Sequence, residues 1–245
     1  MRGDAARGGE APINRPESAR VLLVGEVAVA LGPRLELSGH QPLDDEPSQS
    51  GAFEKDGQGA NAPEAILLSP GNEGRLAELR RRWGAVPMLL GLRDDTLAGR
   101  IHCLASGADD FWLTDRPPSD LLTRLRLHLA VARRAAPASE RCEPLRLGDL
   151  ELDPIHRRVR RGGRHLSLTA REYQLLLLLL RERHTVVSRE RILREIWGEA
   201  EGAGSNVIEV YVRYLRQKLE QEGGRRLIHT VRGKGYCLAE RWPLP

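Results

Sequence analysis

One segment, SNVIEVYVRYLRQKLE at 205–220, restricts the possible folds of this chain more than any other. Apolar side chains recur along it at helical spacing, at Ile208, Tyr211, Val212, Leu215 and Leu219. The opposite face carries Asn206, Val210, Arg213 and Gln217. We therefore predict an amphipathic helix that starts near Ser205 or Asn206 and packs one face against a core. Glu209 and Arg213 stand four residues apart, which favours an ion pair along this helix.

A short basic hairpin is predicted directly after the helix. Two strand-like runs in LIHTVRGKGYCL bracket the tip Arg232-Gly233-Lys234-Gly235. A helix followed at once by a basic hairpin is the order of elements in a winged helix, whose exposed helix can enter a DNA major groove. The helix taken alone is equally consistent with a docked surface helix whose charged face is solvated.

The basic charge of the chain belongs to its C-terminal half. Residues 143–245 hold 20 Lys and Arg against 14 Asp and Glu, whereas residues 1–142 hold 18 against 20. This asymmetry indicates a polyanion-binding module joined to a module with another task.

Several classes of protein are disfavoured by the composition. The longest apolar run, 175–180, is far shorter than the roughly 20 residues that span a bilayer. Residues 1–19 lack the apolar region of a secretory signal and are predicted to be a disordered extension, so we expect a soluble, cytoplasmic protein without a membrane partner. Cys103, Cys142 and Cys237 lack CxxC spacing, which disfavours a disulfide framework or a zinc site.

The N-terminal half alternates strand and helix patterns. Apolar strand-like runs lie at 20–25, 65–68, 86–90 and 107–113. Helices are predicted at 27–37 with a break at Gly32-Pro33, and at 73–83, 96–105 and 118–134. The stretch 39–63 is polar and rich in Gly and Pro, so a long loop is expected there. Such alternation predicts a doubly wound α/β sheet over 20–134.

The C-terminal half, 145–240, is predicted to be a separate α+β domain after a polar linker at 135–144. Short alternating runs predict an antiparallel meander before the helices. Thr169 and Glu172 form a capping-box pattern ahead of six leucines. Ser188 is the predicted cap of a second helix that runs to Trp197.

Four motifs in this half, with their order and spacing, resemble the OmpR/PhoB family of response regulators. They are LSLTAREYQLLLLL, VVSRERILREIWG, VIEVYVRYLRQKLE and LIHTVRGKGYCL. The resemblance implies a winged helix-turn-helix domain, preceded by a flavodoxin-like receiver domain, in a DNA-binding transcription regulator of the two-component type. In such a protein the double-stranded DNA site is a direct repeat.

The same resemblance implies roles for particular residues. It places the last helix in the major groove, with the positions nearest DNA at Asn206, Val210, Arg213, Tyr214 and Arg216. Arg232 would enter the minor groove and Thr230 would contact a phosphate. Arg189 and the indole N–H of Trp197 match positions that contact the DNA backbone. A tryptophan that closes a helix is also often a core residue, and that alternative is open for Trp197.

The N-terminal half resembles the family's receiver domain less closely. LASGADDFWL followed by DLLTRLRLHL resembles the last receiver strand and helix. A working receiver needs clustered carboxylates for Mg²⁺, an acceptor aspartate, a Ser/Thr switch and a lysine. The matching positions are Gly25-Glu26, Ser69, Gly91-Leu92 and 114–118, respectively. We therefore predict a degenerate phosphoacceptor pocket at Glu26 and Ser69, with no metal, cofactor or catalytic residue. Arg116 in the lysine's place, or stray acids at 44–46, is the alternative.

The resemblance also implies a homodimer, paired through salt bridges on the face made by the last two receiver helices and the strand between them. The charged residues predicted on it are Arg100, Asp109, Asp110, Asp120 and Arg124. A solvated helix surface is the alternative.

We therefore predict a transcription regulator that acts without conventional aspartyl phosphorylation. The alternative is a protein-interaction module that docks RNA polymerase or another protein, for which the loop at 198–205 is also a candidate contact. An enzyme is not expected, because no nucleophile–base pair, P-loop or metal cluster is evident.

Overall fold

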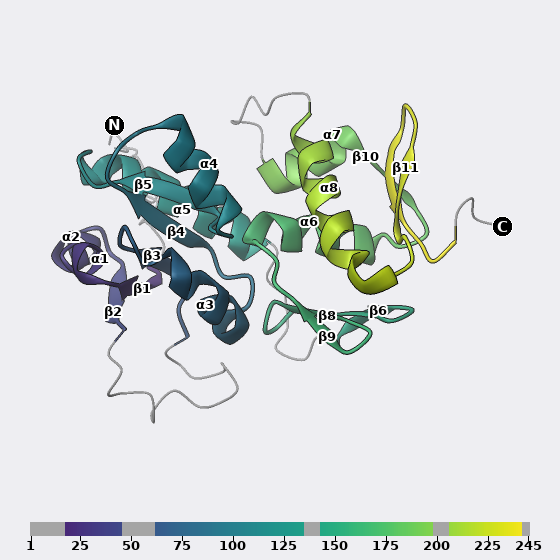
Figure 1. Cartoon of the computed structure of the whole chain (residues 1–245), viewed down its shortest axis with the longest axis horizontal. Helices are drawn as coiled ribbons and strands as arrows, with labels where there is room; N and C mark the ends of the chain where they lie inside the picture. The colour runs from purple at the N-terminus through teal and green to yellow at the C-terminus, as the bar shows by residue number, and fades with distance from the viewer. Residues whose placement is uncertain (1–17, 46–61, 135–142, 198–205, 242–245) are drawn as a thin grey trace, which may run out of the picture.

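The computed structural model describes residues 18–45, 62–134, 143–197 and 206–241, and Figure 1 shows two parts side by side. The extension predicted at 1–19 therefore lies almost wholly outside the described residues, as does most of the predicted linker. The first part is a parallel sheet in the order β2-β1-β3-β4-β5. Its strands are β1 (Arg20–Val24), β2 (Gln41–Asp44), β3 (Ala65–Leu68), β4 (Met88–Leu92) and β5 (Asp110–Leu113). The predicted doubly wound sheet is confirmed.

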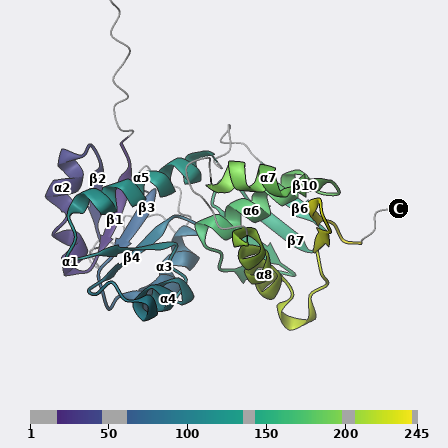
Figure 2. The same ribbon diagram turned by 90° about the horizontal axis from the view of Figure 1, so that it is seen from above.

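Helices cover both faces of this sheet (Figure 2). One face packs against α1 (Glu26–Val29), α2 (Gly32–Leu37) and α5 (Pro118–Arg134). The other packs against α3 (Leu76–Trp83), which follows η2 (Glu73–Arg75), and against α4 (Leu97–Ala105). Neighbouring residues of β1 point to opposite faces, Leu23 toward α5 and Leu22 toward α3, as the strand period of two requires. The expected helix break is present, since Pro33 lies in the first turn of α2.

One predicted loop contains a strand. Residues 39–63 were expected to be loop, but Gln41–Asp44 forms β2, which pairs in parallel with β1. The short QPLD segment lacks the apolar run of a buried strand because β2 is at the sheet edge, where one side meets solvent. Pro42 is tolerated because an edge strand does not need every backbone N–H for pairing. Residues 46–61 of this stretch lie outside the described residues.

The second part is a winged helix, as predicted. The antiparallel meander contains β6 (Leu145–Leu147), β7 (Leu150–Asp153), β8 (Arg158–Arg161) and β9 (Arg164–Leu166). It is followed by α6 (Ala170–Arg181), α7 (Arg189–Ile192), η3 (Leu193–Trp197), α8 (Val207–Leu219) and η4 (Gln221–Gly223). A small sheet in the order β10-β12-β11 forms the wing, from β10 (Val186–Ser188), β11 (Ile228–Val231) and β12 (Gly235–Leu238). The leucines at 175–180 are core residues.

Local sequence signals set where the winged-helix segments begin. The Thr169 hydroxyl accepts the Glu172 N–H and the Glu172 carboxylate accepts the Thr169 N–H, so the predicted capping box is formed. The Ser188 hydroxyl accepts the Arg191 N–H at 3.2 Å. The helix that it caps becomes a π-helical turn from Leu193 to Trp197 rather than one regular α-helix.

A carboxylate of the parallel-sheet part joins the two parts. Asp109 Oδ1 accepts the backbone N–H of Ala170, the first residue of α6, at 2.5 Å. Its Oδ2 accepts the Met88 N–H at 2.7 Å and pairs with the buried guanidinium of Arg80. The first N–H groups of a helix have no partner within it, and Asp109 accepts a hydrogen bond from one of these groups at the start of α6.

A backbone contact lies beside this carboxylate. The Ala85 N–H donates to the Arg157 carbonyl at 3.1 Å, and the Arg158 guanidinium donates to the Arg82 carbonyl at 3.1 Å. Gly84 has φ +62°, and a Cβ atom there would lie 2.6 Å from the His156 carbonyl oxygen. Only glycine permits this approach without a shift of the backbone.

We also find that, in the described part of the chain, no helix is both long enough and apolar enough to cross a bilayer.

Replacing Gly84 by alanine should loosen the contact between the two parts. The new Cβ would overlap the His156 and Arg157 carbonyl oxygens, and the left-handed backbone adds roughly 1–2 kcal/mol of strain. We expect faster amide hydrogen exchange in peptides that cover 84–87 and 155–159. Gly71→Ala is the matched control, because Gly71 has φ +84° with nothing within 4 Å of its Cβ position. Equal exchange in the two variants would contradict the packing argument.

Candidate nucleic-acid interface

Helix α8 has the two faces that its sequence predicts. Ile208, Val212, Leu215 and Leu219 are buried in the winged-helix core. The opposite face leaves Arg213 and Gln217 in solvent, with Val210 42% and Tyr214 49% exposed. Apolar and aromatic side chains held in water beside an arginine are available for contacts with a partner.

A groove of about 250 Å³ separates α8 from the β11–β12 hairpin. Arg213 of α8 and Arg232 and Lys234 of the hairpin tip contribute basic side chains to it. All three residues are exposed. The predicted basic tip is therefore formed, and it lies across the groove from Arg213 of α8.

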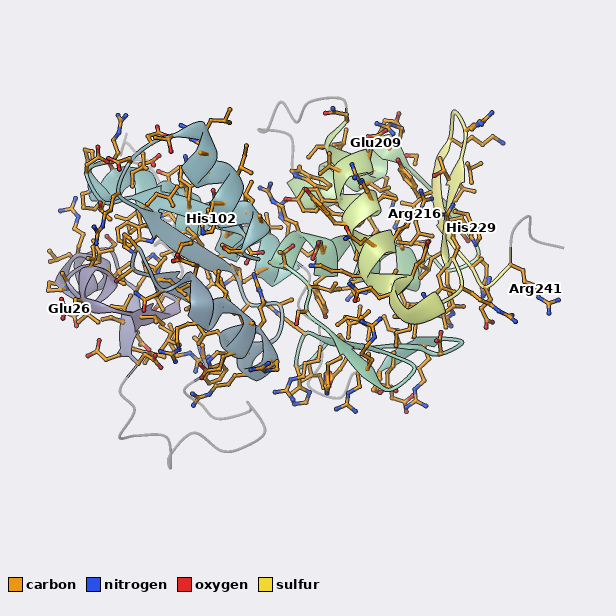
Figure 3. The ribbon with its side chains drawn as sticks, viewed as in Figure 1. Glu26, His102, Glu209, Arg216, His229 and Arg241 are labelled. Carbon is orange, nitrogen blue, oxygen red and sulfur yellow. The ribbon has the colours of Figure 1, made fainter. Side chains whose placement is uncertain are left out.

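Arg216 connects α8 to the wing. Its Nε and Nη2 atoms donate to the Ile228 carbonyl at 3.0 and 2.8 Å, and Nη2 also donates to the Thr230 hydroxyl at 2.8 Å. Burial, followed by the nearby charge of Arg226, lowers the pKa of Arg216 below its usual value. The guanidinium predicted at the major groove therefore holds β11 against α8. Figure 3 labels Arg216 on α8.

Arg189 is bound to a carboxylate of α8. Its guanidinium pairs with the Glu209 carboxylate, with Nη2 at 3.2 Å from Oε2. The hydrogen bond from Arg189, which outweighs burial, lowers the pKa of Glu209. Glu209 thus pairs with the start of α7 instead of with Arg213, the partner that the i,i+4 spacing predicts. Because this contact spans 20 residues of sequence, helical periodicity could not reveal it.

The sequence allows Trp197 to be either a DNA-backbone contact or a core residue. In the structure it is a core residue. It is 2% exposed, and its ring packs edge-on against Tyr211 with centroids 5.2 Å apart. The indole nitrogen is buried and has no hydrogen-bond partner among the described residues. An approaching phosphate cannot reach this N–H without rearrangement. Asn206 is exposed at the N-cap position of α8, where its side chain makes no capping bond.

The far end of α8 is fixed by two basic residues, Arg161, which the sequence did not single out, and Lys218. The buried guanidinium of Arg161 donates to the Leu219 carbonyl at 2.9 Å and to the Arg225 carbonyl at 2.6 Å. Lys218 pairs with Glu172 of the capping box at 2.6 Å. Cations at a helix C-terminus stabilise its free carbonyl groups. The signal for Arg161 was its place in an alternating strand, where every second residue faces inward.

Groups of the protein itself fill the predicted phosphoacceptor position. Ser69 is buried, and its hydroxyl accepts the Ala28 N–H at 2.8 Å. A Cβ atom on Gly25, which has φ +88°, would lie 2.8 Å from the Ser69 hydroxyl. A second carboxylate at position 25 would therefore overlap Ser69. Glu26 is exposed at the end of the molecule that Figure 3 shows far from α8.

Of the acids at 44–46, Glu46 lies outside the described residues. Asp44 is exposed, whereas Asp45 pairs with Arg75 at 2.9 Å. Gly91 packs against Pro70, and the Trp112 indole donates to the Leu68 carbonyl at 3.2 Å. Across the described ranges, no cluster of three His, Cys, Asp or Glu side chains is arranged to hold a metal ion. The described residues at this position therefore do not supply the carboxylate ligands that Mg²⁺ requires.

Cys103 and Cys237 are buried free cysteines, as expected for packing residues, whereas Cys142 lies outside the described residues. Burial raises the pKa of Cys103 to about 12. A thiol with such a pKa stays protonated near neutral pH and is a weak nucleophile.

An apolar stripe on α4 marks a second surface. Leu97, Ile101 and Leu104 recur at helical spacing and are 53–75% exposed. Figure 3 labels His102 on the same helix. The sequence predicts this helix, but it does not indicate that these residues stay uncovered.

The charges predicted beside this stripe are paired within the chain. Arg100 pairs with Asp95 and lies over the Phe111 ring. Arg124 pairs with Asp110 and Asp120, at 3.1 Å in each case. Burial acts to raise the pKa of Asp110, but His128, the Phe111 N–H and Arg124 outweigh it and hold that pKa below its usual value. Asp109 is absent from this surface, because its carboxylate is bound to Arg80 and α6.

The fold and the groove together define a regulator in which a parallel sheet is coupled to a winged helix. Residues 163–238 match the family model described as "Transcriptional regulatory protein, C terminal". Response regulator MprA of Mycobacterium bovis and of Mycobacterium tuberculosis is 36% identical over 235 residues, which cover 92% of this chain and all of the relative. MprA of Mycobacterium sp. strain KMS is 40% identical over 189 residues, which cover 75% of this chain and 81% of the relative.

A solved structure of a RitR mutant has the same fold over most of the chain. Its TM-score is 0.71 at 25% identity, and the match covers 91% of this chain and all of that one. The chain belongs to the OmpR/PhoB family of response regulators, with a receiver-like part followed by a winged-helix DNA-binding part.

Replacing Arg216 by alanine should destabilise the winged helix by about 1–3 kcal/mol, because the Ile228 carbonyl loses a charged hydrogen-bond donor. Chemical denaturation of the full chain measures this change, and hydrogen exchange in β11 should rise with it. Arg213→Ala is the matched control on the same helix, since Arg213 is exposed. We expect that control to stay within about 0.5 kcal/mol of the parent. If the two variants were equally stable, Arg216 would not stabilise the contact between β11 and α8.

Proposed function

We propose that this response regulator binds direct-repeat DNA as a homodimer and does so without conventional aspartyl phosphorylation. The observation that carries the proposal is the exposed face of α8 beside a basic groove, in a chain whose phosphoacceptor position is closed by Ser69. The proposed division is a receiver-like domain at 20–134 and a winged helix at 145–240. Chromosomal DNA as the ligand implies activity in the cytoplasm.

The exposed residues of α8 are the proposed readers of base edges. Arg213 offers a bidentate donor to guanine, and Val210 offers an apolar contact to a thymine methyl group. Tyr214 and Asn206 extend the same exposed face. Tyr214, at a position where much of the family has a basic residue, can both stack and donate a hydrogen bond.

The wing supplies the second set of proposed contacts. Arg232 and Lys234 are exposed at its tip, where an arginine can enter a narrow minor groove of strongly negative potential. Thr230 and Arg189 lie along the groove and are proposed to contact phosphates. Arg216 acts by holding the wing in place, and Trp197 by packing under α8, so neither needs to contact a base directly.

The chemistry of the Ser69 site supports the proposed independence from phosphorylation. A serine hydroxyl cannot form the acyl phosphate that an aspartate forms, and the Ser69 hydroxyl already accepts the Ala28 N–H. Glu26 alone, in solvent, cannot replace a cluster of carboxylates around Mg²⁺. Arg116 is also exposed, in the turn after β5.

The proposed dimer uses the α4 stripe of Leu97, Ile101 and Leu104, since burial of exposed apolar surface is the main driving force for association. Arg100, Asp110, Asp120 and Arg124 surround the stripe and can exchange partners between protomers. Asp109 is left out of the proposed interface because it is committed to Arg80 and Ala170.

The untreated protein should select genomic fragments that contain repeats about one helical turn apart. Arg213→Ala/Arg232→Ala should weaken binding to those fragments at least about tenfold at physiological salt, because base-edge and minor-groove contacts are both lost. Sequencing of selected fragments and fluorescence anisotropy measure these effects. Arg34→Ala/Arg93→Ala is the control, since it removes two exposed arginines remote from the groove.

Enrichment of single sites would count against the dimer. No enrichment, with RNA polymerase still bound by the variant, would favour the protein-docking alternative. The loop at 198–205 proposed for such docking lies outside the described residues.

Acetyl phosphate with Mg²⁺ should leave the intact mass of this protein unchanged, because the Ser69 position holds no acceptor carboxylate. A conventional receiver treated in parallel verifies the reagent. An acid-resistant, base-labile adduct on an aspartate would overturn the phosphorylation-independent part of the proposal, while leaving DNA binding untouched.

A further inference from the structure

A cleft of about 240 Å³ lies where the receiver-like part meets the winged helix. The end of α3 and the turn after it form one wall, and strands β8 and β9 form the other. Figure 1 shows α3 beside these two strands. We call this feature the basic cleft, because its lining includes Arg80, Arg81, Arg157, Arg158, Arg160 and His165.

Among the described residues that line the basic cleft there is no Asp or Glu. Arg80 is already neutralised by Asp109. Arg157 and Arg158 donate to backbone carbonyls, of Ala132 and Arg82 respectively, and among the described residues neither forms an ion pair with a carboxylate. Arg81 and Arg160 are exposed at the cleft.

The pKa of His165, which lies in this cleft, reflects the positive charge around it. Burial first, and then the charges of Arg160 and Arg158, lower the pKa of His165. Its Nε2 atom accepts a hydrogen bond from Arg160 Nε at 3.1 Å, which is consistent with a neutral ring. The Nε atom of Arg158 is buried without a hydrogen-bond partner among the described residues. Like charges held this close repel one another, and a bound anion would relieve that repulsion.

We propose that the basic cleft binds the phosphate group of a small phosphorylated ligand. Arg81, Arg158 and Arg160 supply the guanidinium donors, whose planar geometry matches phosphate oxygens. Ser167 adds an exposed hydroxyl to the same lining. A small ligand is favoured over a nucleic acid because the cleft is narrow and shares no lining residue with the groove beside α8.

The position of the cleft gives the ligand a regulatory consequence. Arg81 belongs to α3, whereas Arg158 and Arg160 belong to β8, so one phosphate group would bridge the two parts. The ligand would then stabilise the arrangement in which Ala85 is bonded to Arg157 and Asp109 to Ala170. This inference stands apart from the proposed DNA contacts and does not rest on them.

The test is calorimetric titration of the full-length protein with pyrophosphate and, separately, with methyl phosphate, at constant ionic strength. We expect one site per chain for at least one probe, with a dissociation constant of about 1 mM or tighter. Which probe binds more tightly shows whether the site takes a diphosphate or a phosphomonoester. Arg81→Gln/Arg160→Gln should weaken binding by about tenfold or more. Both side chains are exposed, so the variant should fold, which circular dichroism verifies.

Arg34→Gln/Arg93→Gln is the matched control, because it removes the same charge from exposed positions outside the cleft. Its affinity for the probes should equal that of the parent. The proposal is overturned if neither probe binds saturably, or if the control loses as much affinity as the cleft variant. It is also overturned if the cleft variant keeps full probe affinity and loses only DNA affinity, since the arginines would then belong to the DNA-binding surface.

Discussion

The Asp109 carboxylate links the two parts of this molecule through hydrogen bonds to both. It receives the Arg80 guanidinium and the Met88 N–H from the parallel-sheet part and the Ala170 N–H from α6. A buried carboxylate without such partners would be costly, so the three donors and the carboxylate depend on one another. Because α6 carries the core leucines of the winged helix, the position of that core relative to the sheet is tied to this group.

A second set of interactions connects α6 to α8 and the wing, the proposed DNA-binding surface. Glu172, in the first turn of α6, pairs with Lys218 of α8, and Arg161 holds the carbonyl group of Leu219. Arg216 then fixes β11 to α8. Each contact joins an arginine or lysine to a carbonyl or carboxylate on another element. Helix α8 and the wing are therefore held together, and their exposed residues face solvent.

The receiver-like part keeps the architecture of its family while its phosphoacceptor position is filled by protein groups. The Ser69 hydroxyl accepts a hydrogen bond from α1, and Gly25, which has a positive φ, lies close against Ser69. The proposed independence from a phosphoryl group requires another input, and the proposed ligand of the basic cleft is one of related chemistry. The cleft lies between the parts that the family's signal would have to couple, and its arginines come from both. The α4 stripe, exposed in this arrangement, stays available for a second protomer.

The sequence by itself determined the elements and their faces, because helical and strand periodicity are local properties of the chain. The stripe of α8, the capping box at Thr169 and the alternation of parallel strands with helices were all readable in this way. The edge strand β2 was not, since half-exposed QPLD has no apolar run. Only the tertiary structure decided what the charged side chains do. Asp109 meets Ala170 across 61 residues, Arg189 meets Glu209 across 20, and Arg81 faces β8 across the basic cleft. Long, charged side chains choose partners by distance in space, and that distance is set by packing rather than by neighbouring sequence.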